Sequence, residues 1–131
     1  MPLCVRQSNT PHATALYKRY QAVVWWATPV EIASALARLV RMQLLDPSDW
    51  AKARHLASRL ADTWSVIQPT DAVRTKGTQV IERYDLRAAD ALQLAAAFEW
   101  CQDVPQGRVF LTGDDKLLQA AALAGFAVAH V

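Results

Sequence analysis

The sequence predicts an α/β fold in which a parallel sheet is flanked by helices, and two observations lead to this expectation. Short apolar runs alternate with longer amphipathic segments, a pattern typical of parallel strands covered by helices on both faces. Alanine supplies 24 residues and glycine only 4, which favours closely packed helices. With 131 residues, 53% of them hydrophobic and 20% charged, one domain over residues 1–131 is expected.

The N-terminal half is predicted to contain three helices and two strands. A threonine N-cap followed by proline predicts a helix over residues 10–20. The β-branched and aromatic run 22–27 predicts a strand buried on both faces. Pro29 and Pro47 open the next two helices, and residues 64–67 form a further strand.

The C-terminal half is predicted to contain three helices and two strands. Helices are expected over residues 70–83, over the very apolar segment 87–101 and over residues 114–124. Strands are expected over residues 108–112 and 127–129. In folds of this class ligands bind at the carboxyl ends of the parallel strands, so polar residues there are candidates for function.

Several classes of protein are disfavoured by composition. Cys4 and Cys101 make no disulfide framework, and the chain has no CxxC or HxxxH spacing that would suggest zinc. It lacks an apolar stretch of the roughly 18 residues that a transmembrane helix needs, and its start does not resemble a signal peptide. A cytoplasmic protein without membrane contact is therefore expected. The net charge of +2 permits nucleic-acid binding but does not argue for it.

Two acidic residues follow predicted strands directly. Asp114 comes after the strand 108–112 through Thr112 and Gly113, and it could equally be the N-cap of the next helix. Glu31 follows the strand 22–27 and has the capping-box spacing from Thr28. Capping would leave both carboxylates at the same edge of the sheet, so the two interpretations are compatible.

Asp90 is the third acidic candidate, because it is the only charge between Arg87 and Glu99 in an apolar helix. A buried carboxylate must be paired, hydrogen-bonded, metal-bound or protonated. The helix dipole, or an ion pair with Arg87 or Arg83, would also explain its position. If all three carboxylates converge, they form an oxygen-donor site suited to Mg²⁺ or Mn²⁺, the chemistry of metal-dependent nucleases.

Two segments carry a family resemblance. Residues 86–95 (LRAADALQLA) and 110–121 (FLTGDDKLLQAA), together with 28–31 (TPVE) before an apolar helix, resemble in order the motifs of PIN-domain proteins of the VapC toxin type. The resemblance implies a Mg²⁺-dependent (or Mn²⁺-dependent) endoribonuclease, the toxin of a type II toxin–antitoxin pair. It also implies an RNA substrate, a cognate antitoxin that blocks the groove, and a homodimer. The implied catalytic and metal-binding residues are Glu31, Asp90 and Asp114, with Thr112 and Asp115 in support.

The sequence departs from that family in two places. Gln93 stands where many relatives have histidine, a difference expected to have little effect. The family's first strand is central and ends in an aspartate, and residues 1–8 resemble instead the end of the helix that follows it. The chain is therefore expected to lack the central strand and to be unstable and inactive as a nuclease. A gap in the sheet, direct pairing of the flanking strands, or a borrowed strand should result.

Two other functions remain open. The chain could be a non-catalytic module that keeps a surface for antitoxin binding or dimerisation, or an α/β protein whose acidic residues are only helix caps. Part of a set of large apolar residues is expected to be exposed for partner contact. That set is Trp25, Trp26, Leu36, Leu39, Val40 and Trp50.

Overall fold

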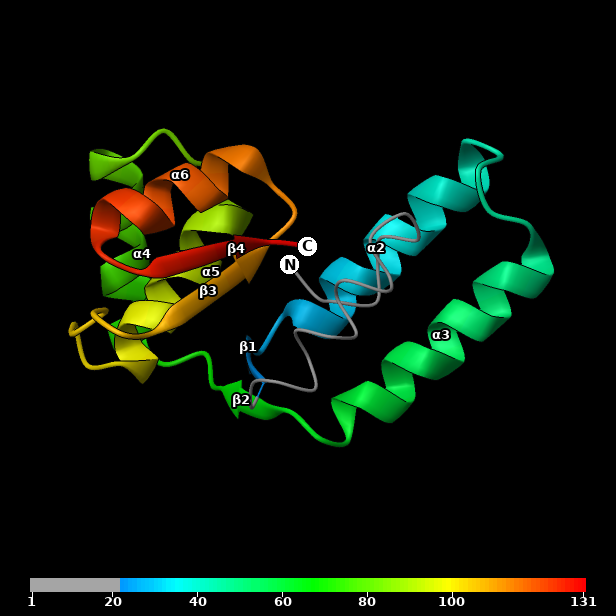
Figure 1. The fold of residues 1–131 in the computed structure, drawn as a ribbon, viewed down its shortest axis with the longest axis horizontal. Helices are drawn as coiled ribbons and strands as arrows, with labels where there is room; N and C mark the ends of the chain where they lie inside the picture. Colours follow the sequence, from blue (N-terminus) through cyan, green and yellow to red (C-terminus); the bar gives the residue numbers. More distant parts are fainter. Residues whose placement is uncertain (1–21) are drawn as a thin grey trace.

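The computed structural model describes residues 22–131, in which short strands alternate with helices (Figure 1). The mixed α/β class expected from the sequence is confirmed. The helix expected over residues 10–20, and the segment 1–8 on which the family comparison of the N-terminus rests, lie outside the described residues. The described elements are β1 (Val23–Trp25), α2 (Thr28–Arg41), α3 (Pro47–Ala61), β2 (Ser65–Ile67), α4 (Asp71–Arg83), α5 (Ala88–Trp100), β3 (Val109–Thr112), α6 (Asp115–Ala124) and β4 (Ala127–His130).

The four described strands form two separate parallel pairs rather than one sheet. β1 pairs with β2, with Val23 opposite Ser65, and β3 pairs with β4, with Val109 opposite Ala127. Within residues 22–131, β1 and β3 do not pair with each other. Of the three arrangements expected for the middle of the sheet, direct pairing of the two flanking strands is therefore not found among residues 22–131.

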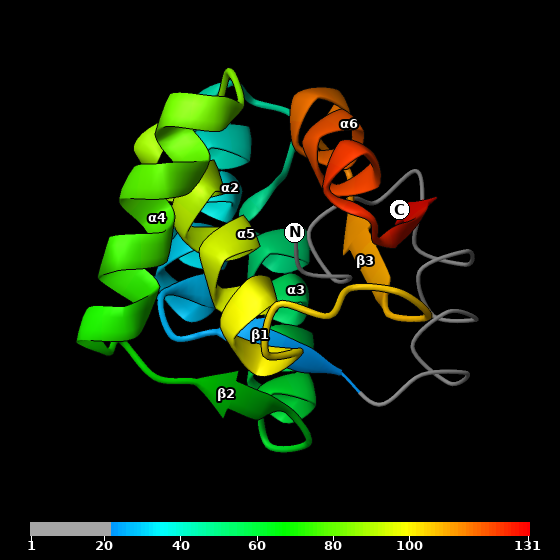
Figure 2. The same ribbon diagram turned by 90° about the vertical axis from the view of Figure 1, so that its left-hand side faces the viewer.

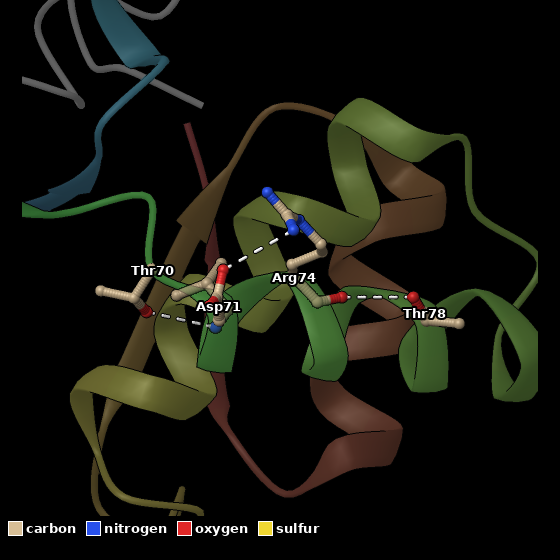
Figure 3. Close-up of polar contacts among 5 residues, drawn as sticks. Thr70, Asp71, Arg74 and Thr78 are labelled. Carbon is tan, nitrogen blue, oxygen red and sulfur yellow. Dashed lines mark hydrogen bonds and ion pairs between the residues drawn. The ribbon is translucent and has the colours of Figure 1, made fainter.

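Side-chain caps set the starts of several helices, as the sequence predicted. The Asp46 carboxylate accepts a hydrogen bond from the Asp49 N–H at 2.8 Å, at the start of α3. In α4 the Thr70 hydroxyl accepts one from the Val73 N–H at 3.3 Å, and an Arg74–Asp71 ion pair of 3.6 Å follows (Figure 3). Among the described helices, none is both long and apolar enough to cross a membrane.

Helix α5 joins the two strand pairs through its buried face. Ala91 and Leu94 pack in the cluster that contains Phe110 of β3, and Ala95 packs in the cluster that contains Trp25 of β1. Figure 2 shows α5 between α4 and the β3–α6 side of the molecule. An apolar helix buried on most sides is what the sequence of this segment predicted.

Close packing of α4 on α5 depends on one glycine. A Cβ built on Gly77 would meet the Leu92 Cδ2 at 3.2 Å, so the Leu92 side chain would have to shift slightly to admit a larger residue there. Gly77 therefore leaves room for the Leu92 side chain at the contact between α4 and α5.

Helices α2 and α3 form a hairpin that extends away from the other helices in Figure 1. Ile32 and Leu36 of α2 pack with Leu45 in their own cluster, and α3 contributes no fully buried residue. Of the six large apolar residues considered for partner contact, Trp25 and Leu36 are buried, Leu39 and Trp50 are half-buried, and Trp26 and Val40 are exposed. The expectation that part of this set is exposed is confirmed by Trp26 and Val40, and their use in partner contact stays a prediction.

Candidate acidic site

Asp114 lies at the carboxyl end of β3 and is also the N-cap of α6. Its Oδ1 accepts a hydrogen bond from the Leu117 N–H at 2.9 Å. Its own N–H donates to the Oγ1 of the fully buried Thr112 at 3.0 Å. Both interpretations of Asp114 from the sequence are thus compatible, because the capping bond uses one carboxylate oxygen and leaves the other available.

Asp90 lies in the first turn of α5 and shares a pocket with Asp114. The pocket, of about 400 Å³, is lined by side chains from the segments that lead into α5 and α6. Burial is the main cause that raises the pKa of Asp90, and the negative charge of Asp114 raises it further, whereas Arg87 lowers it. The lining residues are Asp85, Leu86, Arg87, Asp90, Asp114 and Lys116.

Glu31 lies in the first turn of α2, but the predicted capping box is wrong. The helix begins at Thr28, its N-cap is Ala27, and no side chain caps it. Thr28 is buried inside the first turn, and the Glu31 N–H bonds to the Ala27 carbonyl at 3.1 Å. Because Thr28 has helical rather than N-cap geometry, its hydroxyl does not take the role that the spacing suggested.

The Glu31 carboxylate reaches across to α5 instead. The Nε2 of Gln93 donates a short hydrogen bond to the Glu31 Oε2, while Oε1 is buried and has no hydrogen-bond partner among the described residues. Burial raises the pKa of Glu31, the Gln93 bond lowers it, and the charge of Asp90 raises it. Asp90 therefore interacts electrostatically with Asp114 on one side and with Glu31 on the other.

The two supporting residues differ in their relation to the site. Thr112 holds the backbone of Asp114, as described above. Asp115 is exposed and contacts the Nε2 of His130 at 3.4 Å, and it does not line the pocket. Lys116, which does line it, forms a 3.1 Å ion pair with the exposed Asp85.

The candidate donor atoms are of the chemical type that a hard divalent cation prefers. All the candidate ligands are carboxylate oxygens, and among residues 22–131 the buried Oε1 of Glu31 accepts no hydrogen bond. The structure brings Asp90 and Asp114 into one pocket and leaves Glu31 outside its lining. Within residues 22–131, no three His, Cys, Asp or Glu side chains are gathered closely enough to hold a metal ion.

The sequence indicates Gln93 only as a departure from the family with little effect, whereas in the structure it bonds to Glu31. It lies three positions after Asp90, so the two side chains share one face of α5. Its partner is 62 positions away in the chain, a contact that no local spacing reveals. A polar side chain on the same face as an isolated carboxylate was the only available signal.

No family model, curated protein or solved structure matches the chain.

Proposed function

We propose that this chain is a Mg²⁺-dependent endoribonuclease of the PIN-domain, VapC toxin type, which acts on RNA and is held inactive by a cognate antitoxin; the cleavage assay below also tests the prediction from sequence that this form of the chain is inactive. The observation that carries the proposal is the pairing of Asp90 and Asp114 in one pocket at the carboxyl end of β3. Two negative carboxylates repel each other when they lie side by side, which raises the free energy of the site without a cation. A bound divalent cation would remove this repulsion.

Asp90 and Asp114, the two carboxylates that the resemblance and the pocket have in common, would hold the cation, whereas Glu31, the third residue that the resemblance implies, lies outside the pocket lining. A bound Mg²⁺ or Mn²⁺ supplies activation of water and neutralisation of charge on the phosphodiester. The all-oxygen donor set favours these ions over zinc.

Two cationic side chains beside the aspartates support the proposal of an RNA substrate. Arg87 and Lys116 line the same pocket as the two aspartates, next to the N-termini of α5 and α6. Guanidinium, ammonium and helix N-terminal N–H groups all bind phosphate oxygens, so they would orient the RNA backbone. Lys116 is mostly exposed in its ion pair with Asp85, and such a pair is weak enough to exchange for a phosphate.

A non-catalytic module for antitoxin binding or dimerisation is the second candidate. It is favoured by the exposed apolar side chains of the α2–α3 hairpin and its connecting loop. These are Val40, Met42, Leu44 and Leu56, which are all at least about a third exposed. A homodimer would be compatible with either function.

Cleavage of a single-stranded RNA with Mg²⁺, and again with a chelator, separates the two candidates. The nuclease should cut only with Mg²⁺, and Asp90→Asn should reduce the rate by at least about 100-fold, because one ligand and one charge are lost. Asp62→Asn, at an exposed aspartate after α3, is the matched control and should cut normally. Equal cleavage by both variants would contradict the nuclease proposal, and a dimer without any cleavage would favour the binding module.

A further inference from the structure

The α2–α3 hairpin concentrates positive charge on its surface. Between Ile32 and Leu60 the sequence has five lysine and arginine residues and two aspartates, a surplus of three positive charges in a chain whose net charge is +2. All five cationic side chains are exposed, and none of them forms an ion pair within residues 22–131. The five are Arg38, Arg41, Lys52, Arg54 and Arg59.

Several cationic side chains in the rest of the fold, in contrast, have partners. Three of them are in ion pairs with aspartates, namely Arg74, Lys76 and Lys116. In the hairpin only Arg54 has an aromatic partner among the described residues, the ring of Trp50 at 5.3 Å. The other four cations are therefore available to an anion from outside the chain.

One face of α3 carries a row of cationic and titratable side chains, formed by Lys52, His55 and Arg59. Lys52 and Arg59 are seven positions apart, so they lie on the same side of the helix, about 10 Å apart along its axis. The opposite side of α3, which includes Trp50 and Ala57, packs in the cluster between the two helices. All three members of the α3 row are exposed, and the hairpin extends away from the other helices (Figure 1).

The surroundings of the α3 row are typical of a surface that binds nucleic acid. Ser48 and Ser58 lie beside the cations, with the exposed Leu56 at one edge, and the aspartates Asp49 and Asp62 lie at the two ends of the helix. Lysine is depleted in protein–protein interfaces, whereas interfaces with nucleic acid are strongly positive. Charge and composition therefore favour a polymer of phosphates as the occupant over an acidic protein.

We infer that the outer face of α3, centred on Lys52 and Arg59, binds the phosphate backbone of single-stranded RNA. The choice of RNA rests on the proposed function, whereas the positive charge of the surface does not depend on it. Neither residue lines the acidic pocket, so this surface would hold a longer RNA without taking part in its cleavage. Binding through phosphates releases counterions, so it should weaken as salt increases.

The test is fluorescence anisotropy of a labelled single-stranded oligouridine with the full chain, at several salt concentrations and with a chelator present to prevent cleavage. The double variant Lys52→Gln/Arg59→Gln should reduce the slope of log K against log salt by about 1.4, since each phosphate contact contributes about 0.7. The same loss corresponds to about 10-fold weaker binding near 0.15 M salt. Arg74→Gln/Arg108→Gln, at two exposed arginines outside the hairpin, has the same net charge and should keep the slope of the unmodified chain.

Two further measurements make the result specific. Lys52→Arg/Arg59→Lys keeps both charges at the surface and should bind RNA as the unmodified chain does. Equal weakening by the hairpin variant and its control would overturn the inference, because only net charge would then matter. Poly-glutamate in place of RNA tests the other occupant: if the hairpin variant loses poly-glutamate binding but keeps RNA binding, the surface belongs to an acidic protein and the inference fails.

The outcomes also distinguish this inference from the proposed function. If the unmodified chain binds RNA through the α3 face but cuts none with Mg²⁺, the proposed function fails and this inference stands. If it cuts RNA with Mg²⁺ while Lys52→Gln/Arg59→Gln binds RNA equally well, only the role of the α3 row fails.

Discussion

Asp114 has two roles that substitution can separate, a helix cap and a charged ligand. Asp114→Ala removes the Oδ1 that accepts from the Leu117 N–H at 2.9 Å. Loss of such a cap costs about 1 kcal/mol of unfolding free energy, or roughly 3–5 °C in Tm for a domain of this size. Asp114→Asn keeps an oxygen acceptor at the same place and removes only the charge.

The charge itself has opposing effects on stability. Losing a negative charge at the N-terminus of α6 costs about 0.3–1 kcal/mol, and losing the repulsion that raises the pKa of Asp90 offsets it. Asp114→Asn should therefore lie within about 0.5 kcal/mol of the unmodified chain. Its interaction with a divalent cation, in contrast, should be almost abolished.

Thermal unfolding followed by circular dichroism, with and without Mn²⁺, measures both roles in one experiment. At a Mn²⁺ concentration about 100 times Kd, the unmodified chain should gain about 2.7 kcal/mol by mass action. Without Mn²⁺, Asp114→Asn should have the Tm of the unmodified chain and Asp114→Ala should have a lower one. Neither variant should gain much stability when Mn²⁺ is added. A full Mn²⁺ gain in Asp114→Asn would refute the ligand role, and equal Tm values for the two variants would refute the cap.

Two further predictions concern stability alone. Burial and the Asp114 charge raise the pKa of Asp90, so its contribution to stability is present in acid and is lost as pH rises through the folded-state pKa. Without divalent cations, Asp90→Asn should therefore have a larger free energy of unfolding than the unmodified chain at pH 7, as measured by urea titration. The difference should vanish below about pH 4, where Asp90 is protonated. Gly125, at φ +110°, would place a Cβ 3.0 Å from the Pro105 Cγ, whereas Gly107, at φ +79°, has open space. Gly125→Ala should thus cost about 1–3 kcal/mol and more than Gly107→Ala in denaturant midpoints, and equal losses would show that the contact with Pro105 is unimportant.

Local signals in the sequence predicted the elements well because their causes are local. The Asp46, Thr70 and Asp114 caps each bond to an N–H three residues later, so residue type and spacing are sufficient to find them. Gly125 likewise ends α6 in a left-handed conformation, as the sequence predicted. Strand lengths were less predictable: the apolar run 22–27 yields a strand of only three residues, since strand ends depend on the partner strand.

Long-range features of the site were less accessible from sequence. The Thr28 spacing suggested a capping box for Glu31, but the chain enters α2 with Ala27 already in a helical conformation. The Glu31–Gln93 bond arises only after α2 and α5 are placed side by side. Sequence order likewise predicted parallel strands correctly, but it did not decide among the three arrangements expected between β1 and β3, because pairing there depends on what lies between them.

The unequal burial of the helices has a consequence for local unfolding. Helix α5 contributes to both strand-associated clusters, so its amide hydrogens should exchange with solvent only when most of the fold opens. Helix α3 has no fully buried residue and packs mainly on α2. It can therefore unfold locally while the clusters around α5 stay intact. Hydrogen exchange should be fast over α3 and slow over α5, and a protease added to the native protein would cut first in the α2–α3 hairpin.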